Sequence, residues 1–435
     1  MRVSLQFLSK NQTKLSLFSP ELLSGMARNR IFSDVFNEET SSGVALKNKA
    51  LKKLIFNLLD KEDSSSITEL SKELNISVPK TTSLINELIE DRLISDYGKI
   101  DSTGGRKASM YGLVAEACFF LGVDVKKYYV NIGLMDFKKH LVTQKTKIPF
   151  RLENTQASLS QLIQLINQFI KEAPVKKDKI LSMGINLSGR INQTIGYSYS
   201  FFHFQEEPLS GIIENKTGIK TYLENDSRAM AYGEFMCGEV STEKNVLFVN
   251  VDYGVGLGIL IDGKIYYGKS GFSGEFGHAP LFENEIICHC GKKGCLETEA
   301  SGTALIRRFR ERIQEGSSSS VVKKVKNLND LTVTDLIQAA NAEDMLCIEL
   351  LAEVGEKLGK GLAALINVFN PELIILGGTL SETGDYLRLP TKSAINKYSL
   401  SLVNTDTQLK LSRLGEKAGV LGACLLARNK VLTVF

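Results

Sequence analysis

The chain has 435 residues, of which 43% are hydrophobic and 23% are charged, and its formal net charge is +4. This length predicts two or three domains, and the composition is ordinary for a globular protein. No apolar run approaches the about 18 residues of a membrane-spanning helix, and the N-terminus does not resemble a signal peptide. We therefore expect a cytoplasmic protein without membrane contact. The small net charge alone does not bear on nucleic-acid binding.

The first regular pattern in the chain predicts a helix-turn-helix. An N-terminal extension, residues 1–43, precedes it, and we assign this extension no role. In residues 44–114, apolar side chains first recur at helical spacing, and Ser66 with Glu69 then forms a capping box that begins a second helix. Ser77 is the expected N-cap of a third helix, which follows after a short turn. Two helices joined in this way are typical of DNA-binding helix-turn-helix domains.

The start of the third helix and a glycine-hinged loop after it are the expected DNA contacts. A loop tip that carries two cations between two short strands is typical of a wing, which reaches phosphates or the minor groove. The residues expected to face operator DNA are Ser77, Val78, Lys80, Thr81, Thr82, Ser83, Arg106 and Lys107. The alternative is a three-helix module that binds protein. We predict a winged helix-turn-helix DNA-binding domain over residues 44–114.

An α/β region follows, and one strand end within it carries candidate ligand-binding residues. Asn225 and Asp226 come directly after a predicted strand and open the next helix. Polar groups at the carboxyl ends of strands are where α/β sheets bind ligands. The Asn225 amide can donate to and accept from two adjacent hydroxyl groups. The alternative role for Asp226, capping the helix, is compatible with ligand binding.

A cluster of cysteines predicts a metal site. Cys288, Cys290 and Cys295 are three of the seven cysteines in the chain, and His278 precedes them by ten residues. Thiolate sulfur and imidazole nitrogen are the preferred ligands of tetrahedral Zn²⁺, and four of them make a closed, structural site. His289 competes for the fourth position, but in an extended segment it points away from its neighbours, which favours His278. The alternatives are ordinary buried thiols or, less favoured with an odd cysteine count, a disulfide.

These residues belong to a longer motif. The run from Gly274 to Glu297 reads Gly-Glu-Phe-Gly-His and then C-x-C-G-x-x-G-C-x-E, and Ser301 follows closely. The motif closely resembles the signature of the ROK family (repressors, open reading frames, kinases). That family contains bacterial sugar kinases and sugar-responsive repressors on one actin-like, hexokinase-like (ribonuclease H-like) fold. Residues 44–114 are also similar to the winged helix-turn-helix that ROK repressors carry and ROK kinases lack.

The resemblance implies an α/β protein in which a two-lobed ATPase-type domain follows the DNA-binding domain. The first lobe would comprise residues 115–238, completed by a C-terminal helix at residues 416–435. The second lobe, residues 239–415, would carry the zinc site and oligomerisation helices. A sugar would bind between the lobes. The residues expected to contact it are Gly189, Asn225, Asp226, Glu275, His278 and Glu297.

The sequence departs from ROK kinases at one hairpin. Those kinases carry Asp-x-Gly-Gly-Thr, whose glycines let backbone amides cradle phosphates, whereas here Asp124 is followed by Val-Lys-Lys-Tyr at residues 125–128. Asp226 resembles the kinase catalytic base, which deprotonates a sugar hydroxyl. Without a phosphate loop, the same carboxylate would serve only as a hydrogen-bond acceptor. We therefore expect no catalytic residue.

Together these observations predict a repressor of sugar-utilisation genes. It would bind operator DNA through the winged helix-turn-helix and a sugar or sugar phosphate between its lobes, with Zn²⁺ in a structural role. Symmetric operators imply a homodimer or homotetramer. The main alternative is an ATP-dependent ROK sugar kinase with Asp226 as catalytic base. A second alternative is a catalytically silent scaffold that binds protein through its helical module.

Overall fold

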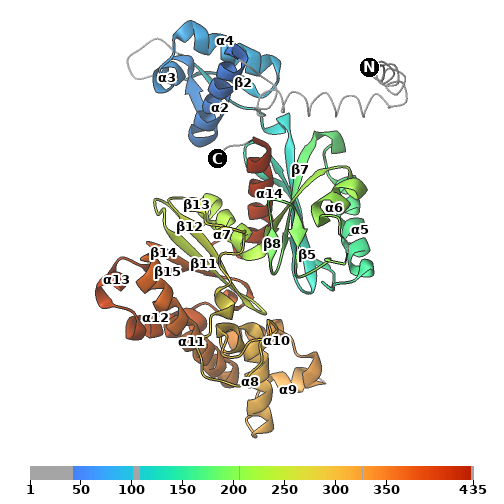
Figure 1. Ribbon diagram of the computed structural model, residues 1–435, viewed down its shortest axis with the longest axis vertical. Coiled ribbons are helices and arrows are strands. Elements are labelled where there is room, and N and C mark those ends of the chain that lie inside the picture. The colour runs from blue at the N-terminus through green and yellow to red at the C-terminus, as the bar shows by residue number, and fades with distance from the viewer. Residues whose placement is uncertain (1–42, 101–107, 205, 326, 433–435) are drawn as a thin grey trace, which may run out of the picture.

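The computed structural model describes residues 43–100, 108–204, 206–325 and 327–432, and these residues form three parts along the long axis of the molecule (Figure 1). An N-terminal module lies at one end, a first α/β lobe in the middle and a second α/β lobe at the other end. Each lobe is built on a five-stranded sheet. In the described ranges, no helix combines the length and apolar character that crossing a membrane requires.

The N-terminal module is a winged helix-turn-helix, as predicted. Its elements are α2 (Val44–Glu62), β1 (Ser64–Ser66), α3 (Ile67–Glu73), α4 (Val78–Glu90), β2 (Ile94–Ile100) and β3 (Ala108–Leu113). The strands form an antiparallel sheet in the order β1-β3-β2. The Glu69 N–H donates to the Ser66 hydroxyl at 3.2 Å, and the Ser66 N–H donates to the Glu69 carboxylate at 2.8 Å. This reciprocal pair confirms the predicted capping box.

The first lobe is a mixed sheet with helices on both faces. Its elements are β4 (Phe119–Val125), β5 (Tyr129–Asp136), β6 (Leu141–Pro149), α5 (Gln156–Glu172), β7 (Ile180–Leu187), β8 (Ile191–Asn192), β9 (Tyr197–Ser198), α6 (Leu209–Thr217), β10 (Lys220–Asn225) and α7 (Asp226–Cys237). The strand order is β10-β7-β4-β5-β6, and β10, β7 and β4 are parallel. Helices α5 and α6 cover one face, and the C-terminal helix α14 (Lys417–Leu432) covers the other (Figure 1).

Two strand glycines explain why α14 packs so closely on this sheet. A β-carbon added to Gly184 in β7 would lie 2.2 Å from the Ala423 carbonyl oxygen, and one added to Gly122 in β4 would lie 2.5 Å from the Val420 carbonyl oxygen. A side chain at either position would force the helix away, so glycine is used where another backbone approaches. In this structure the last helix packs on the sheet of the first lobe.

The second lobe combines a mixed sheet with a group of helices. Its strands are β11 (Val246–Val251), β12 (Val255–Ile261), β13 (Lys264–Ile265), β14 (Leu373–Gly377) and β15 (Gln408–Leu411), in the order β13-β12-β11-β14-β15. Its helices are α8 (Gly302–Gln314), α9 (Val321–Lys324), α10 (Val333–Asn341), α11 (Met345–Phe369), α12 (Asp385–Tyr398) and α13 (Ser401–Thr405). The largest apolar core of the lobe joins the inner strands to α8, α10 and α11. The loop with the cysteine cluster lies between β13 and α8.

Candidate functional site

The corner between β10 and α7 holds the two residues on which the predicted ligand site depends. β10 ends at Asn225 and α7 begins at Asp226, so both lie at the carboxyl end of a parallel strand. The Asn225 side-chain oxygen accepts from the Arg228 N–H at 3.1 Å, and its nitrogen donates to the Gly189 carbonyl at 3.0 Å. The amide thus caps α7 and fixes the Gly189 loop. One N–H and one lone pair of the amide remain for a ligand.

Asp226 is a largely buried carboxylate that its neighbours orient. The Ser188 hydroxyl donates to Oδ2 at 2.8 Å, and the Ser227 N–H and hydroxyl donate to Oδ1 at 2.7 and 3.2 Å. These are three of the roughly four hydrogen bonds that a carboxylate can accept. Because Asn225 caps the helix, the capping role considered for Asp226 is taken by its neighbour. Asp226 therefore keeps acceptor capacity in a fixed orientation.

The second lobe contributes Glu297, which is also held in place by hydrogen bonds. The Val255 N–H donates to Glu297 Oε2 at 3.0 Å, and His289 Nδ1 lies 2.8 Å from Oε1. Burial opposes ionisation of this carboxyl, but the hydrogen bonds from His289 and Val255 outweigh burial and lower its pKa. The same contact with Glu297 raises the pKa of His289. Glu297 is thus an ionised carboxylate with a set orientation.

The hairpin of β11 and β12 brings Asp226 and Glu297 to the same interlobe corner. A β-carbon added to Gly256 would lie 2.0 Å from the hydroxyl of Ser227, the residue after Asp226. A β-carbon added to Gly254, at the start of the same hairpin, would lie 2.4 Å from Glu297 Oε2. The two glycines let both lobes approach the hairpin closely. The structure therefore places carboxylates of both lobes beside one turn.

The four predicted metal ligands form one cluster next to this corner. His278 Nδ1 lies 3.5 Å from Cys288 Sγ, and Cys290 Sγ lies 3.6 Å from Cys295 Sγ. The four candidate ligand atoms all lie within 4.8 Å of one another. These separations fit the edges of a tetrahedron around a metal with bonds of about 2.0–2.3 Å. The donor set and its geometry therefore suit a four-coordinate metal ion.

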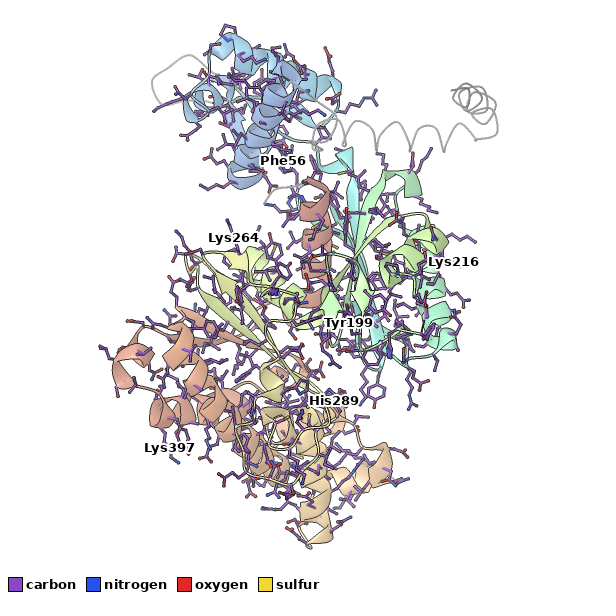
Figure 2. The ribbon with its side chains drawn as sticks, in the orientation of Figure 1. Phe56, Tyr199, Lys216, Lys264, His289 and Lys397 are labelled. Carbon is purple, nitrogen blue, oxygen red and sulfur yellow. The ribbon has the colours of Figure 1, made fainter. Side chains whose placement is uncertain are left out.

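His278 connects the cysteine cluster to the interlobe corner. Its Nδ1 faces the sulfur atoms, while its Nε2 lies 3.8 Å from Glu275 Oε2. His289, the competing ligand, turns Nδ1 toward Glu297, and its side chain is 71% exposed (labelled in Figure 2). The four-residue group contains His278 and not His289, whereas His289 belongs to a second, three-residue group with His278 and Glu297. One imidazole nitrogen is thus available to a metal and the other to a ligand in the corner.

The hairpin that departs from the kinase pattern is closed by its own side chains. Asp124 is fully buried at the end of β4, and Lys126 Nζ lies 3.5 Å from its Oδ2. Burial raises the pKa of the Asp124 carboxyl. Burial also opposes the charge on Lys126, but Asp124 and the carboxylates of Asp252, Asp226 and Glu416 outweigh it and raise the pKa of the ammonium. A buried cation therefore lies at this hairpin, beside a carboxylate whose two oxygens have no hydrogen-bond partner in the described residues.

Among the predicted DNA-facing residues, the structure corrects one. Ser77 is the N-cap of α4, and the side chains of Val78 and Ser83 are exposed on the first turns of that helix. Thr81 is fully buried, and its hydroxyl donates to the Ser77 carbonyl at 3.2 Å, because helical spacing turns it toward the core of the module. Thr81 therefore does not face DNA. Lys80 and Thr82 are partly exposed, whereas Arg106 and Lys107 lie outside the described residues.

A buried ion pair ties the DNA-binding module to the first lobe. Arg428 of α14 makes two contacts with Asp60 of α2, Nη2–Oδ1 at 2.5 Å and Nη1–Oδ2 at 3.3 Å, and Arg428 is 1% exposed. Its guanidinium lies 5.2 Å from the ring centroid of Phe56 (labelled in Figure 2) and 5.6 Å from that of Phe137. At the other end of α14, the Asn186 amide donates to the Gly419 carbonyl at 2.7 Å. One helix thus runs from the interlobe region to the module.

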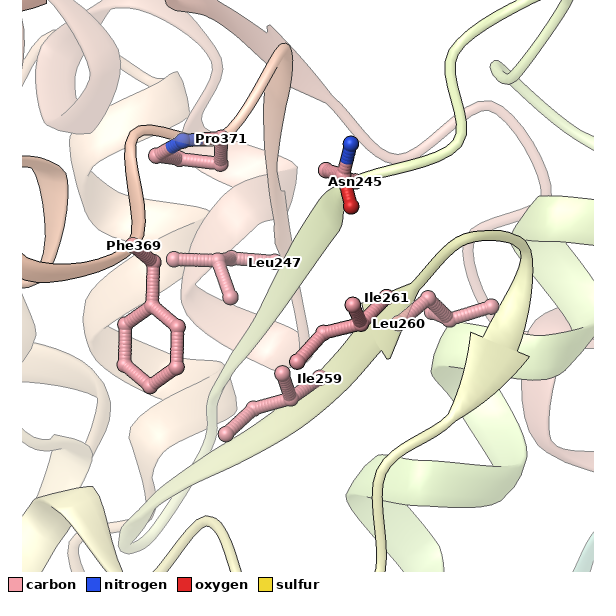
Figure 3. Close-up of a pocket in the computed structure, with 7 residues that line it drawn as sticks. All are labelled: Asn245, Leu247, Ile259, Leu260, Ile261, Phe369 and Pro371. Atoms are coloured by element: carbon pink, nitrogen blue, oxygen red, sulfur yellow. The ribbon is translucent and has the colours of Figure 1, made fainter.

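A small pocket lies away from this corner (Figure 3). It is lined by Asn245, Leu247, Ile259, Leu260, Ile261, Phe369 and Pro371. These residues surround the start of β11, whereas Asp252 and the interlobe corner lie beyond its other end. Only one of the seven lining side chains is polar. The pocket therefore lacks the hydrogen-bonding groups of the predicted site and plays no part in the functional proposal.

A winged helix-turn-helix joined to two α/β lobes, with carboxylates and a cysteine–histidine cluster between them, defines a regulator-type protein on an actin-like kinase architecture. The model of the ROK family matches residues 120–430, and the chain belongs to the ROK family. A model for winged helix-turn-helix DNA-binding domains matches residues 49–95. The combination of the two confirms the predicted family and fold.

Similar proteins include repressors and kinases. The xylose repressor of Caldicellulosiruptor bescii is 29% identical, over 85% of this chain and 92% of that repressor. The DNA-binding transcriptional dual regulator NagC of Escherichia coli K12 is 30% identical, over 87% of this chain and 92% of NagC. The crystal structure of a ROK family transcriptional regulator, a homolog of the E. coli Mlc protein, has a TM-score of 0.74 and 28% identity, covering 89% of this chain and 97% of its own. A ROK family glucokinase from Streptomyces griseus, in complex with glucose and AMPPNP, has a TM-score of 0.63 and 25% identity, covering 72% and 99%.

Sequence reasoning missed several partners of the predicted residues. Ser188 and Val255, which orient the two central carboxylates, carry no local pattern that marks them, because the contacts join distant segments. The role of His289 at Glu297 was also missed, since His289 was considered only as a metal ligand. Arg428 had a usable signal: a fully charged guanidinium in an apolar C-terminal helix requires a buried partner.

Proposed function

We propose that this ROK protein is a sugar-responsive transcriptional regulator that represses sugar-utilisation genes. The observation that carries the proposal is the union, in one chain, of a winged helix-turn-helix with an interlobe corner of oriented carboxylates. In this proposal Lys126, which lies beside the buried Asp124, closes the nucleotide end of the same interlobe region. The similarity to a xylose repressor and to NagC over most of the chain supports the repressor role.

The effector in this proposal is a sugar or sugar phosphate bound at the interlobe corner. Asp226 and Glu297 accept hydrogen bonds from its hydroxyl groups, and Asn225 both donates and accepts. Glu275 and the free Nε2 of His278 add contacts from the second lobe. Gly189 contributes through its loop, whose carbonyl Asn225 already holds. Oriented carboxylates suit neutral polyols, because each keeps acceptor capacity for a hydroxyl donor without itself changing charge.

The metal in this proposal is Zn²⁺, held by His278, Cys288, Cys290 and Cys295. With four protein ligands, the ion supplies rigidity to the loop and offers no open position for catalysis. Cys295 is two residues before Glu297, so the metal fixes the carboxylate that faces the sugar. The His278 ring is fixed by the same ion, which sets the direction of its second nitrogen. The metal is therefore structural, and it affects sugar affinity by fixing the positions of Glu297 and His278.

Operator DNA is bound, in this proposal, by the module of residues 44–114. The contact residues are Ser77, Val78, Lys80, Thr82 and Ser83 on α4, with Arg106 and Lys107 of the wing. The first lobe spans residues 115–238 with the C-terminal helix, and the second lobe spans residues 239–415. A homodimer or homotetramer presents two modules to a symmetric operator at a spacing of one or more helical turns.

Helix α14 is the proposed route from the sugar to the DNA. Its first half is hydrogen-bonded to the first lobe beside Asp124, and its last half carries the Arg428–Asp60 pair. A sugar that changes the separation of the lobes shifts α14 and, with it, the module. A coupling free energy of about 1–3 kcal/mol is enough to change DNA affinity roughly 5–150-fold.

A ROK sugar kinase with Asp226 as catalytic base is the second candidate function. The similarity to the S. griseus glucokinase and the hydrogen-bonded, buried Asp226 favour it. The closed hairpin after Asp124 speaks against it, since Lys126 occupies the phosphate side. An ATP-coupled assay on hexoses, N-acetylated amino sugars and xylose separates the two candidates. If the protein turns over ATP and the Asp226→Asn substitution abolishes this turnover, the kinase is the function and the regulator proposal is wrong.

The regulator proposal is tested by a mobility-shift assay on DNA upstream of sugar-utilisation genes. At low salt the protein is expected to shift this DNA, and one sugar of the panel to release it. Lys80→Ala is expected to weaken binding to all sequences alike and to reduce the salt-dependence slope by about 1, because it removes one phosphate contact. Glu73→Ala, which alters an exposed acidic residue on the neighbouring helix, is the control. No shift at low salt would remove the proposal.

A further inference from the structure

The β4–β5 turn of the first lobe touches the second lobe through aromatic rings. The centroids of Tyr128 and Tyr253 lie 5.3 Å apart at an interplanar angle of 68°, which is an edge-to-face pair. Lys127 Nζ lies 4.5 Å from the Tyr253 centroid and 5.4 Å from that of Tyr128. A cation over two ring faces adds an attraction to the pair itself. The three side chains form a single contact, which we call the interlobe latch.

On the first-lobe side, the latch residues are fixed by the backbone around them. The Lys126 N–H donates to the Tyr129 carbonyl at 2.9 Å and closes the turn. The Lys127 and Tyr128 carbonyls accept from the N–H groups of residues 152 and 150, at 3.0 and 3.2 Å. The side chains of residues 126–128 therefore diverge from a turn that is anchored on both sides. Lys126 points in to Asp124, while Lys127 and Tyr128 point to the second lobe.

Tyr253, on the second-lobe side, is equally well anchored. It lies two residues after the end of β11 and packs against the main apolar core of that lobe. Its carbonyl accepts from the Thr303 hydroxyl at 2.7 Å, at the start of α8. The latch therefore joins the rigid body of one lobe to the rigid body of the other. Movement of one lobe is therefore transmitted to the other lobe through this contact.

The latch lies where the kinase pattern would hold phosphates between two loops. In a protein that binds a nucleotide there, the ligand itself joins the lobes and can leave. Here the side chains of the latch make the connection, and they cannot dissociate from the protein as a ligand does. Lys126 neutralises the buried Asp124 that such a ligand would face. Four carboxylates act on that ammonium, Asp252 of the second lobe among them. The connection is thus both aromatic and electrostatic.

We propose that the β4–β5 turn is a permanent interlobe latch, which replaces a nucleotide as the bridge between the lobes and fixes their approach at that end. The effector then binds at the corner beside a contact that the chain already makes, and it acts as the removable bridge between the lobes. The second statement rests on the proposed sugar-responsive function. The latch itself is a property of the chain without any ligand, so the two are tested separately.

The test is a double-mutant cycle on Tyr128 and Tyr253 in the full-length protein. Tyr253→Leu and the double variant are expected to show the same increase in radius of gyration by small-angle X-ray scattering without ligand, and Tyr128→Leu a smaller one, because Lys127 still contacts Tyr253. Each is expected to weaken binding of the sugar that wild type binds by about three- to tenfold, measured by calorimetry, because closure is no longer assisted. Equal effects in Tyr253→Leu and the double variant are the mark of one shared contact.

The matched control is Tyr398→Leu. Tyr398 is 42% exposed and has its own lysine, Lys397, 5.0 Å from the ring centroid, but the pair lies within one helix of the second lobe. This variant is expected to leave the radius of gyration and sugar affinity unchanged. Lys127→Met gives a second probe, since Lys127 is exposed and its loss should not prevent folding. It is expected to shift both readouts in the same direction by a smaller amount.

Two results would overturn the latch. One is a radius of gyration that stays at the wild-type value in the folded double variant and in Lys127→Met. The other is an additive effect of the two tyrosine substitutions, which would show that the rings act independently. If wild type binds no sugar, the sugar half of the proposed function fails, and the ligand-free scattering still decides on the latch.

Discussion

The two ends of the interlobe region differ in how their polar groups are used. At the β4–β5 end, Asp124 is buried beside Lys126 and Tyr128 meets Tyr253, and neither oxygen of Asp124 has a hydrogen-bond partner among the described residues. At the α7 end, Asp226 and Glu297 are oriented by hydrogen bonds but retain acceptor capacity. In our proposal, the difference teaches that one scaffold can lose one ligand and keep another. A side chain that fills a binding site, as we propose for Lys126, removes that site. A side chain that only orients its neighbour, as Ser188 orients Asp226, preserves the site.

Removing the proposed metal is expected to have the largest effect, and it acts on the ligand-binding end alone. Structural Zn²⁺ contributes on the order of 10 kcal/mol in zinc-finger peptides, so Cys290→Ser should lose the ion and loosen the loop that holds Glu297. Metal content by mass spectrometry, sugar affinity and DNA binding are measured together. Sugar affinity should fall while sugar-free DNA binding persists. Cys237→Ser, at an exposed cysteine outside the cluster, is the control; a metal-free wild type contradicts the prediction.

The substitution Lys126→Met tests the Asp124–Lys126 pair at the β4–β5 end. It leaves the buried Asp124 carboxylate without its cation, and breaking such a pair costs about 3–5 kcal/mol of the free energy of unfolding. Urea denaturation should show this loss. The double variant Asp124→Asn/Lys126→Met should recover most of it, because the charge that needed the lysine is gone. If Lys126→Met is as stable as wild type, the pair does not close this end.

Asp226→Asn sharpens the contrast from the ligand-binding side. A hydrogen bond to a charged group is worth about 1.5–3 kcal/mol, so the sugar dissociation constant should rise by roughly 10–100-fold. Stability and sugar-free DNA binding should change little, since the amide keeps its contacts with Ser188 and Ser227. Calorimetric titration measures the affinity, and Asp262→Asn on an exposed turn is the control. Unchanged sugar affinity would show that the sugar does not bind at Asp226.

Arg428 tests whether the ligand-binding end communicates with the DNA-binding module. In the double variant Asp60→Asn/Arg428→Met no buried charge is left unpaired, but the link between α14 and α2 is lost. We expect sugar affinity to remain within about twofold and the sugar-induced change in DNA affinity, a coupling of about 1–3 kcal/mol, to shrink toward zero. Fluorescence anisotropy with labelled operator measures this coupling. Lys430→Met, at the partly exposed end of the same helix, should leave the coupling intact.

Much of the fold could be predicted because its signals are local. The capping box at Ser66, the N-cap at Ser77 and the alternation of buried strands with helices each lie within a few residues. The four-residue cluster of His278 and the cysteines was also predictable, since ligand spacing in the sequence reflects a tight loop. Family resemblance supplied what local patterns could not, namely that two lobes enclose a site.

The remaining features depend on contacts between distant segments. Thr81 was expected to face DNA because small polar residues gather at the start of α4, yet helical geometry turns it inward. The contact between Tyr128 and Tyr253 joins two turns that lie far apart in the sequence. No periodicity reports such a contact. The presence of lysine and tyrosine in place of glycine predicted a filled turn, but not which partner would receive those side chains.

The most direct test of the account measures DNA binding and ATP turnover in one titration. Labelled operator DNA is bound by the protein, and a panel of sugars and sugar phosphates is added with and without ATP and Mg²⁺. The account predicts that one effector changes DNA affinity at least fivefold, to the same extent with and without ATP, and that no ADP forms. Release that requires ATP, or ADP formation that depends on the sugar, would contradict it.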